Sequence, residues 1–317
     1  VEKAAMLSGG SEWDSRGNDR ADIPGFVMSD GPHGVRRQLG EGDHLGIGAS
    51  KPATCFPTAC TVANTWDPAL AEEMGEALGK EAHDLDVNVL LGPGMNIKRN
   101  PLCGRNFEYY SEDGVLAGKL AAAQVNAMAT KGTYNYIKHF ALNDQETNRC
   151  AFLLTYSNEQ AIREIYLKPF ELCIKNFDGT QIAVMSSFNW IGTVPACANE
   201  DTLTTILRNE WGFQGMVITD YDGSYGYMIT DHCVRTGNDL MLGFSSQASN
   251  QLTNTESATL NNALRTSCKN IMYTIANSGY YTNTTDDSGM SNMTKLFVTI
   301  DVVTCLLYTS PSPRDTR

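Results

Sequence analysis

The chain has 317 residues, 42% of them hydrophobic, which is enough for one large single-core domain of about 250 residues and argues against a set of small modules. Its 36 acidic and 24 basic residues give a net charge of -12, which disfavours nucleic acid or an anionic membrane surface as partner and suits a neutral ligand such as a sugar. The nine cysteines include no Cys-x-x-Cys pair, so a zinc ribbon or a redox dithiol is unsupported.

Six short apolar runs, each followed by polar residues, are predicted to be strands. They are Phe26–Ser29, Val87–Leu91, Tyr134–Ile137, Ile182–Met185, Met216–Thr219 and Asp239–Leu242. Between these runs the apolar residues recur at helical spacing, and this alternation is typical of βα units that build a parallel sheet.

The predicted helices lie between the strands and after the last one. They span Pro68–Leu85, Asp113–Lys131, Ser157–Phe170, Asn199–Trp211 and Ser257–Ser278. The first begins with Asp67 as a cap and proline at the first helical position, and the third begins with a capping box at Ser157–Gln160.

Repeated βα units within about 230 residues predict an α/β fold of the (β/α)8 TIM-like barrel type, with irregular first strands. An open doubly wound sheet is the second possibility. That fold usually has a glycine-rich phosphate loop after its first strand, and the chain contains neither G-x-G-x-x-G nor a Walker sequence.

Three parts are expected along the chain. Residues 1–245 form the catalytic barrel, and 246–290 form a linker and a helix that packs on the barrel or leads to a second domain. Residues 291–317 hold an apolar segment and a disordered or artefactual tail. The apolar run 296–308 is too short to cross a membrane unless it begins an anchor that continues beyond residue 317. The location stays open, because free cysteines slightly favour the cytoplasm while secretion or anchoring remain compatible with a chain that begins at Val1.

Polar side chains follow several predicted strands. Asp30, Lys138 with His139, Ser186 with Asn189, and Asp220 all occupy such positions. In a barrel these side chains converge on one mouth, where reactive groups are found. Carboxylates, long cations and aromatic rings together suit a sugar, and hydrolysis of a glycoside needs two carboxyl groups.

Six motifs, in register from about residue 2 to about residue 278, resemble glycoside hydrolase family 3 of the β-glucosidase type. They are SDGPHGVR (29–36), PLCGRNFEYYSED (101–113), KHFALNDQETNR (138–149), REIYLKPFE (163–171), VMSSFN (184–189) and WGFQGMVITDYDG (211–223). The resemblance implies a retaining exo-β-glycosidase that hydrolyses terminal β-linked glucose from a β-glucoside or a short β-linked oligosaccharide. It implies no cofactor and no metal.

The resemblance also assigns roles to individual residues. Asp220 is the catalytic nucleophile that forms a covalent bond to the sugar. Asp30 accepts hydrogen bonds from hydroxyls at the far end of the ring. The other substrate-binding residues it implies are Arg36, Arg105, Lys138 and His139 at the hydroxyls, and Met185, Phe188 and Tyr221 as pocket lining.

Two positions depart from the family pattern. Tyr221 stands where the family usually has tryptophan, which predicts a different stacking surface, and Phe188 stands where many members have tyrosine, so that a hydroxyl near the nucleophile is absent. The sequence motif around Asp30 is closer to glucosidases than to xylosidases.

The general acid/base of the retaining mechanism is not evident in the chain. One branch of the family keeps a histidine in the loop after Lys-His-Phe, but here that loop reads Ala141–Glu146 and has none. In the glucosidase branch the acid/base is a glutamate of a second, α/β sandwich domain. We therefore expect this glutamate to come from a domain before residue 1 or after residue 317, and the chain alone to be weakly active or inactive.

Other interpretations remain open at this stage. The chain could be a non-catalytic sugar-binding barrel, or a barrel lyase that forms a Schiff base at Lys138. Arg105 could serve a structural ion pair with Glu108 or Glu112. Asp222 is close enough to Asp220 to suggest a carboxylate pair, although proximity along a loop fixes neither geometry nor role.

Overall fold

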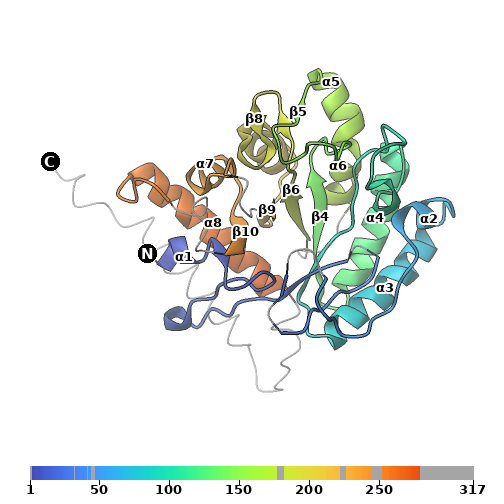
Figure 1. Ribbon diagram of the computed structural model, residues 1–317, viewed down its shortest axis with the longest axis horizontal. Coiled ribbons are helices and arrows are strands. Elements are labelled where there is room, and N and C mark those ends of the chain that lie inside the picture. Colours follow the sequence, from blue (N-terminus) through green and yellow to red (C-terminus); the bar gives the residue numbers. More distant parts are fainter. Residues whose placement is uncertain are drawn as a thin grey trace.

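A computed structural model describes residues 2–31, 33–40, 42–43, 47–176, 182–221, 226–244 and 252–278. Its centre is a curled sheet of seven parallel strands (Figure 1). The strands are β1 (Ser8–Gly9), β2 (Met28–Asp30), β3 (Val89–Leu91), β4 (Tyr134–Phe140), β6 (Ile182–Ser186), β9 (Val217–Tyr221) and β10 (Leu240–Phe244).

The strands follow the order of the chain from β2 to β10, and β1 then pairs with β10. This order is that of a barrel, so the predicted fold class is confirmed, with seven strands rather than eight in the part of the chain that the structure describes. All six predicted strands are present, and β1 is an addition of only two residues. The segment between β1 and β2 contains η1 (Asp19–Ala21) in place of a long helix, as expected for irregular first strands.

The main helices connect successive strands or follow the last. They are α3 (Pro68–Asp84), α4 (Gly114–Ala129), α6 (Lys168–Lys175), the π-helical η5 (Asp201–Glu210), α7 (Thr230–Thr236) and α8 (Ala258–Asn277). Shorter helical segments are α1 (Glu2–Ala5), α2 (Ala59–Ala63), η2 (Asn106–Glu108), α5 (Glu159–Ala161), the π-helical η3 (Ile162–Tyr166) and η4 (Ala196–Ala198). A small separate sheet contains β5 (Leu154–Thr155), β7 (Trp190–Ile191) and β8 (Val194–Pro195).

Side chains cap the starts of several helices, among them α3 and α8. Asp67 accepts hydrogen bonds from Ala69 N and Leu70 N at the start of α3, and Ser257 accepts one from Leu260 N at the start of α8. The prediction that Ser157 caps the third helix is wrong. Asn158 occupies the cap position, and its side chain accepts a hydrogen bond from Ala161 N.

The two faces of the sheet are covered by different elements. Alternate residues such as Ile137 and Val217 face outward and pack against α4, α6 and η5, whereas Tyr136 and Ile218 face the concave side. That concave side is filled by apolar residues of α8, among them Ile271. In Figure 1, α3 and α4 accordingly lie on one side of the sheet and α8 on the other.

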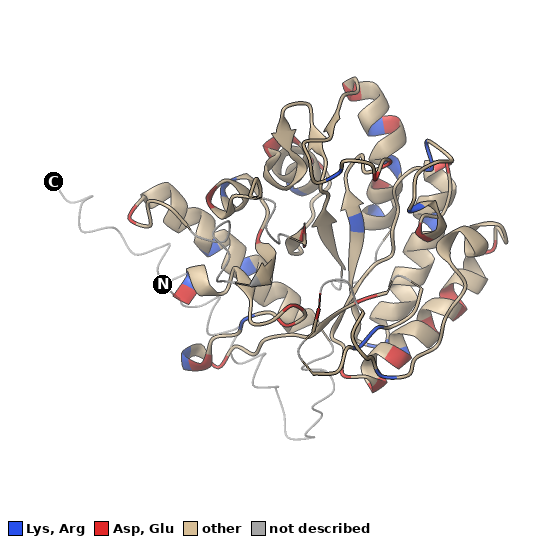
Figure 2. Ribbon diagram, in the orientation of Figure 1, with Lys and Arg blue, Asp and Glu red and all other residues tan. Residues whose placement is uncertain are grey.

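Charged residues lie mostly on the helices and loops around the sheet (Figure 2). None of the helices in the described residues is long and apolar enough to cross a membrane. The predicted apolar run 296–308 and the tail after it lie outside those residues, as do 246–251 and 279–290 of the expected linker and helix.

Candidate active site

The alternation of side chains along the strands brings polar groups together at one mouth of the barrel. Because Met28, Tyr136 and Ile218 face the concave side, the residues two positions later, Asp30, Lys138 and Asp220, face it as well. In a parallel sheet the carboxyl ends of the strands lie at one edge, so these three residues from β2, β4 and β9 meet.

His139 reaches the same mouth through an irregularity in β4. Simple alternation would turn His139 away from Lys138, but the register with β6 shifts between Ile137 and Phe140. Such an irregularity changes the direction in which side chains point, and both Lys138 and His139 face the cavity. The backbone at His139 is held by the Asn96 side chain, whose Oδ1 accepts from His139 N at 2.7 Å and whose Nδ2 donates to His139 O at 2.8 Å.

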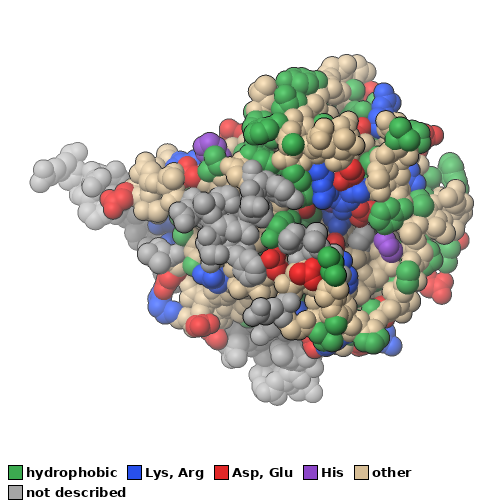
Figure 3. All heavy atoms as spheres, in the orientation of Figure 1, with side chains coloured by type: hydrophobic (Ala, Val, Ile, Leu, Met, Phe, Trp, Pro, Cys, Tyr) green, Lys and Arg blue, Asp and Glu red, His purple; other side chains and the backbone are tan. Residues whose placement is uncertain are grey.

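A cavity of 480 Å³ lies at this mouth, a size suited to a small ligand. In the space-filling view, side chains of both charges gather there between hydrophobic ones (Figure 3). The cavity is lined by Glu12, Trp13, Asp30, Leu91, Gly104, Arg105, Lys138, His139, Glu146, Arg149, Met185, Phe188, Asp220, Tyr221 and Leu242. Eight of the nine predicted site residues are therefore brought together; Arg36 is not in the lining, and its Nη2 lies 3.5 Å from Asp30 Oδ2.

Asp220 has two oxygens in different environments. Its Oδ1 accepts a hydrogen bond from Tyr221 N at 2.7 Å, whereas Oδ2 is buried without a hydrogen-bond partner among the described residues. His139 Nε2 lies 3.6 Å from Oδ2. Burial raises the pKa of Asp220, and the positive charges of Arg105, Arg149 and Lys138 oppose that rise.

Asp30 and Lys138 form a tight pair at the opposite side of the cavity. Lys138 Nζ lies 3.0 Å from Asp30 Oδ1 and 4.0 Å from Glu108 Oε2, and the lysine side chain is only 3% exposed. Burial opposes ionisation of Asp30, but Lys138, Arg36 and Arg105 outweigh it and lower the pKa of Asp30 to about 2. Asp30 is therefore ionised, and a hydrogen-bond acceptor, at neutral pH.

Arg105 serves two purposes at once. Its Nε donates to Glu108 Oε1, which realises the ion pair considered from the sequence, and its side chain also lines the cavity. Glu108 is buried and contacts both Arg105 and Lys138, so this carboxylate fixes two cations of the site.

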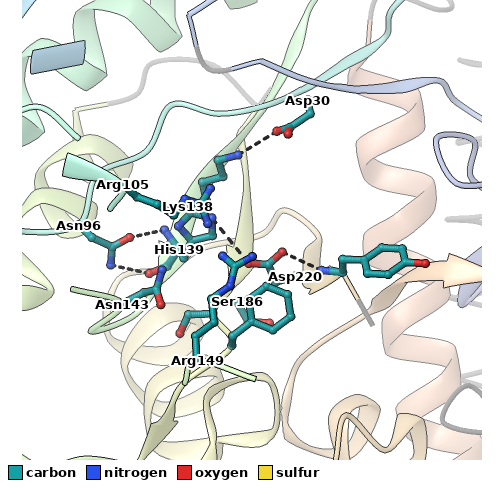
Figure 4. A network of polar contacts seen from close by, with 12 residues as sticks. Asp30, Asn96, Arg105, Lys138, His139, Asn143, Arg149, Ser186 and Asp220 are labelled. Atoms are coloured by element: carbon teal, nitrogen blue, oxygen red, sulfur yellow. Dashed lines mark hydrogen bonds and ion pairs between the residues drawn. The ribbon is translucent and has the colours of Figure 1, made fainter. Parts of the chain in front are cut away.

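His139 is neutral in this environment. Burial, together with the charges of Arg105, Lys138 and Arg149, lowers the pKa of His139 well below its usual value. Its Nδ1 lies 2.9 Å from Tyr109 Oη, and its other ring nitrogen faces Asp220 (Figure 4).

Sequence reasoning missed seven lining residues, of which Glu12, Trp13, Glu146 and Arg149 are the four with polar or aromatic side chains. Arg149 lies with its guanidinium carbon 4.6 Å from the centre of the Phe188 ring and donates to Glu146 Oε2 at 2.8 Å. Glu12 and Trp13 come from the segment after β1. All four lie in loops rather than at predicted strand ends, although Glu146 and Arg149 fall within the motif KHFALNDQETNR, which was a usable signal.

Other polar residues near strand ends are structural. Ser186 Oγ donates to Ile218 O and Asn238 Oδ1, and Asn189 Nδ2 donates to Ala141 O, so both are used within the protein. Asp222 lies outside the described residues. Within those residues, no group of three or more His, Cys, Asp or Glu side chains is arranged to hold a metal ion.

Comparisons with known proteins identify the family of the chain. Residues 9–252 match the model of the glycosyl hydrolase family 3 N terminal domain. The chain is 42% identical over 220 residues to thermostable beta-glucosidase B of Acetivibrio thermocellus, and 43% identical over 228 residues to an exo-alpha-(1->6)-L-arabinopyranosidase of Bifidobacterium breve. These matches cover 69% and 71% of the chain but 29% of each relative.

Among solved structures, beta-glucosidase 3B of Thermotoga neapolitana in complex with glucose has a TM-score of 0.76 and 33% identity, covering 89% of this chain and 42% of the other. Beta-glucosidase of Kluyveromyces marxianus in complex with glucose has a TM-score of 0.77 and 29% identity, covering 94% and 36%. With a family match over most of its length and a site at the expected mouth of the barrel, the chain belongs to glycoside hydrolase family 3.

Proposed function

We propose that the chain is the catalytic barrel of a retaining exo-β-glycosidase that releases terminal β-linked glucose through a covalent glycosyl–Asp220 intermediate. The observation that carries this proposal is the difference between the hydrogen-bond environments of the two Asp220 oxygens. Asp220 lines the cavity, and its Oδ1 accepts a hydrogen bond from Tyr221 N, while Oδ2 is buried without a hydrogen bond to the described residues. A nucleophile needs an ionised oxygen that no donor occupies.

The surrounding cations keep this nucleophile usable at neutral pH. Burial alone would favour the protonated carboxyl group, which cannot attack the sugar. The charges of Arg105, Arg149 and Lys138 favour the ionised form, and none of these side chains donates a hydrogen bond to Oδ2. The charge is stabilised while Oδ2 accepts no hydrogen bond from the described residues.

The remaining lining residues suit one pyranose ring. Asp30 offers carboxylate oxygens, and Lys138, Arg105 and His139 offer donors, for hydroxyl groups at the closed end of the cavity. Met185, Phe188 and Tyr221 offer apolar surface for the C–H faces of the ring. Arg36 does not line the cavity but forms an ion pair with Asp30. Its guanidinium carbon lies 5.8 Å from the centre of the Trp13 ring.

The general acid/base is proposed to be a glutamate of a second α/β sandwich domain. Asp30 is bound to Lys138 with a pKa of about 2, and Glu146 is bound by Arg149 and Asn143. Neither is well suited to deliver a proton to a leaving group, although burial raises the pKa of Glu146 and makes it the carboxylate to test. The chain spans 29% of the length of the curated relatives it matches.

The leaving group provides the test. The leaving group of a 2,4-dinitrophenyl β-glucoside departs as the phenolate and needs no proton. The 317-residue chain should therefore cleave this substrate far faster than an alkyl β-glucoside. Azide should accelerate turnover and yield β-glucosyl azide, because a retained configuration requires two displacements. An α-configured azide, or cleavage of both glucosides at similar full rates, would contradict the proposal.

Two matched assays sharpen the assignment. Glu146→Gln should change the rates for both glucosides by a similar factor; a selective loss for the alkyl glucoside would make Glu146 the acid. The corresponding α-L-arabinopyranoside tests the second sugar named among the relatives. A non-catalytic binding barrel would retain either sugar and cleave neither.

A further inference from the structure

Three buried side chains form a hydrogen-bonded series that ends beside the proposed nucleophile. Asn143 Nδ2 lies 3.3 Å from Tyr109 Oη, Tyr109 Oη lies 2.9 Å from His139 Nδ1, and His139 Nε2 lies 3.6 Å from Asp220 Oδ2. Tyr109 is fully buried and does not line the cavity. It is therefore separated from the sugar by His139.

The direction of the hydrogen bonds follows from the first member. Asn143 Nδ2 also donates to Glu146 Oε1 at 3.1 Å, and Glu146 Oε2 is held by Arg149. Turning the Asn143 amide over would point its oxygen at this carboxylate, so the NH2 group is the one that faces both Glu146 and Tyr109. Tyr109 Oη consequently accepts a hydrogen bond from Asn143.

The Tyr109 hydroxyl then has one hydrogen-bond acceptor within reach among the described residues, His139 Nδ1. If His139 Nδ1 carried a proton and donated it to Tyr109 Oη, the tyrosine O–H would be a buried donor without an acceptor among the described residues, an arrangement that proteins avoid. Burial raises the pKa of Tyr109 well above its usual value, so the hydroxyl keeps its proton. Donation from Tyr109 to Nδ1 satisfies both groups.

We propose that Tyr109 is a positioning residue: its hydroxyl donates to Nδ1 of His139 and so places the single ring proton on Nε2, the nitrogen that faces Asp220. The N–H of a neutral imidazole then lies beside the reacting oxygen. At 3.6 Å it does not occupy Oδ2, and it can donate to a sugar hydroxyl bound next to the nucleophile. This consequence rests on the proposed function, whereas the position of the ring proton does not.

The sequence supplies a matched control in the next residue. Tyr110 is also fully buried and also donates its hydroxyl hydrogen, but to Gln124 Oε1 at 2.6 Å on the outer side of the sheet. Tyr109→Phe and Tyr110→Phe each remove one buried hydroxyl. Only the first removes the group that contacts His139.

The test is the ¹⁵N spectrum of the histidine rings of the 317-residue chain, with His139 assigned by its loss in His139→Gln. In the wild type, we expect Nε2 protonated and Nδ1 an unprotonated hydrogen-bond acceptor. In Tyr109→Phe the Nδ1 signal should move toward that of a free unprotonated nitrogen, and in Tyr110→Phe it should stay. A proton on Nδ1 in the wild type, or the same Nδ1 signal in wild type and Tyr109→Phe, would overturn the proposal.

A second variant keeps the test informative if Tyr109→Phe does not fold. Asn143→Ala frees the Tyr109 oxygen to accept from Nδ1, so a minor population protonated on Nδ1 should appear; an unchanged spectrum would remove Asn143 from the series. Labelling by 2-deoxy-2-fluoro-β-glucosyl fluoride adds a functional measurement. Tyr109→Phe should slow it about tenfold, the equivalent of one hydrogen bond, and equal slowing in Tyr110→Phe would contradict a positioning role. If the wild type is not labelled, the proposed function fails and the ring-proton result still stands.

Discussion

Asp220 and Asp239 lie at opposite ends of neighbouring parallel strands, and both are buried, with exposures of 8% and 1%. Both have a pKa raised first by burial and opposed by arginine. They differ in their partners. Asp239 Oδ2 accepts from Arg208 Nη2 at 2.7 Å and from Val217 N at 2.9 Å, and its Oδ1 accepts from Asn270 Nδ2 at 3.0 Å.

This difference separates a structural carboxylate from a reactive one. Asp239 connects β9, β10, η5 and α8 at the closed end of the barrel, where every oxygen is used. Asp220 leaves one oxygen unused at the open end. Burial is thus common to both carboxylates, and only the distribution of donors tells them apart.

The largest expected effect is loss of turnover in Asp220→Ala. Because no other group would form the glycosyl intermediate, kcat/KM for 2,4-dinitrophenyl β-glucoside should fall about 10⁴-fold or more. The free energy of unfolding should change by less than about 1 kcal/mol, since Oδ2 of Asp220 accepts no hydrogen bond from the described residues. Denaturant titration beside the rate assay measures both, and a fully active variant would contradict the assigned role.

Asp239→Ala should show the reverse pattern. It leaves the guanidinium of Arg208, which is 14% exposed, without its buried partner, and we expect a loss of about 3 kcal/mol or more of unfolding free energy. The folded fraction should keep its rate with the activated glucoside. A rate loss as large as that of Asp220→Ala, at full folding, would erase the distinction between the two aspartates.

Arg149→Met tests the smaller electrostatic contribution to Asp220. Attack requires the ionised carboxylate, so the rate falls as the pH drops through the raised pKa of Asp220. Arg149 lowers that pKa, and its removal should move the acid limb of the kcat/KM profile to higher pH. Arg163→Met, which removes a surface ion pair with Glu210, is the matched control and should leave the limb in place. A shift to lower pH in Arg149→Met would contradict the assigned charge effect.

Much of the fold could be predicted because buried parallel strands are continuous apolar runs, and the six longest strands were found this way. The strand Ser8–Gly9 was not, since two residues carry no period. The convergence of Asp30 and Lys138 on one mouth of the barrel followed from their places after strands. The cavity-facing position of His139 depends on a register shift that no local pattern encodes, and Glu12 and Trp13 reach the cavity from a loop whose path only the tertiary structure fixes.

Local sequence also could not show which of Asp220 and Asp239 is the reactive carboxylate, because each aspartate adjoins an apolar strand. The family motifs selected Asp220, and the hydrogen-bond partners give a physical reason for the choice.

Mass spectrometry of the chain after reaction with 2-deoxy-2-fluoro-β-glucosyl fluoride tests the central claim most directly. We predict one added fluoroglucosyl group per chain, located by peptide mapping on Asp220, and none in Asp220→Ala. An unmodified wild-type chain that still binds glucose, or a label on Asp30 or Glu146 instead, would contradict the assignment of Asp220 as the nucleophile.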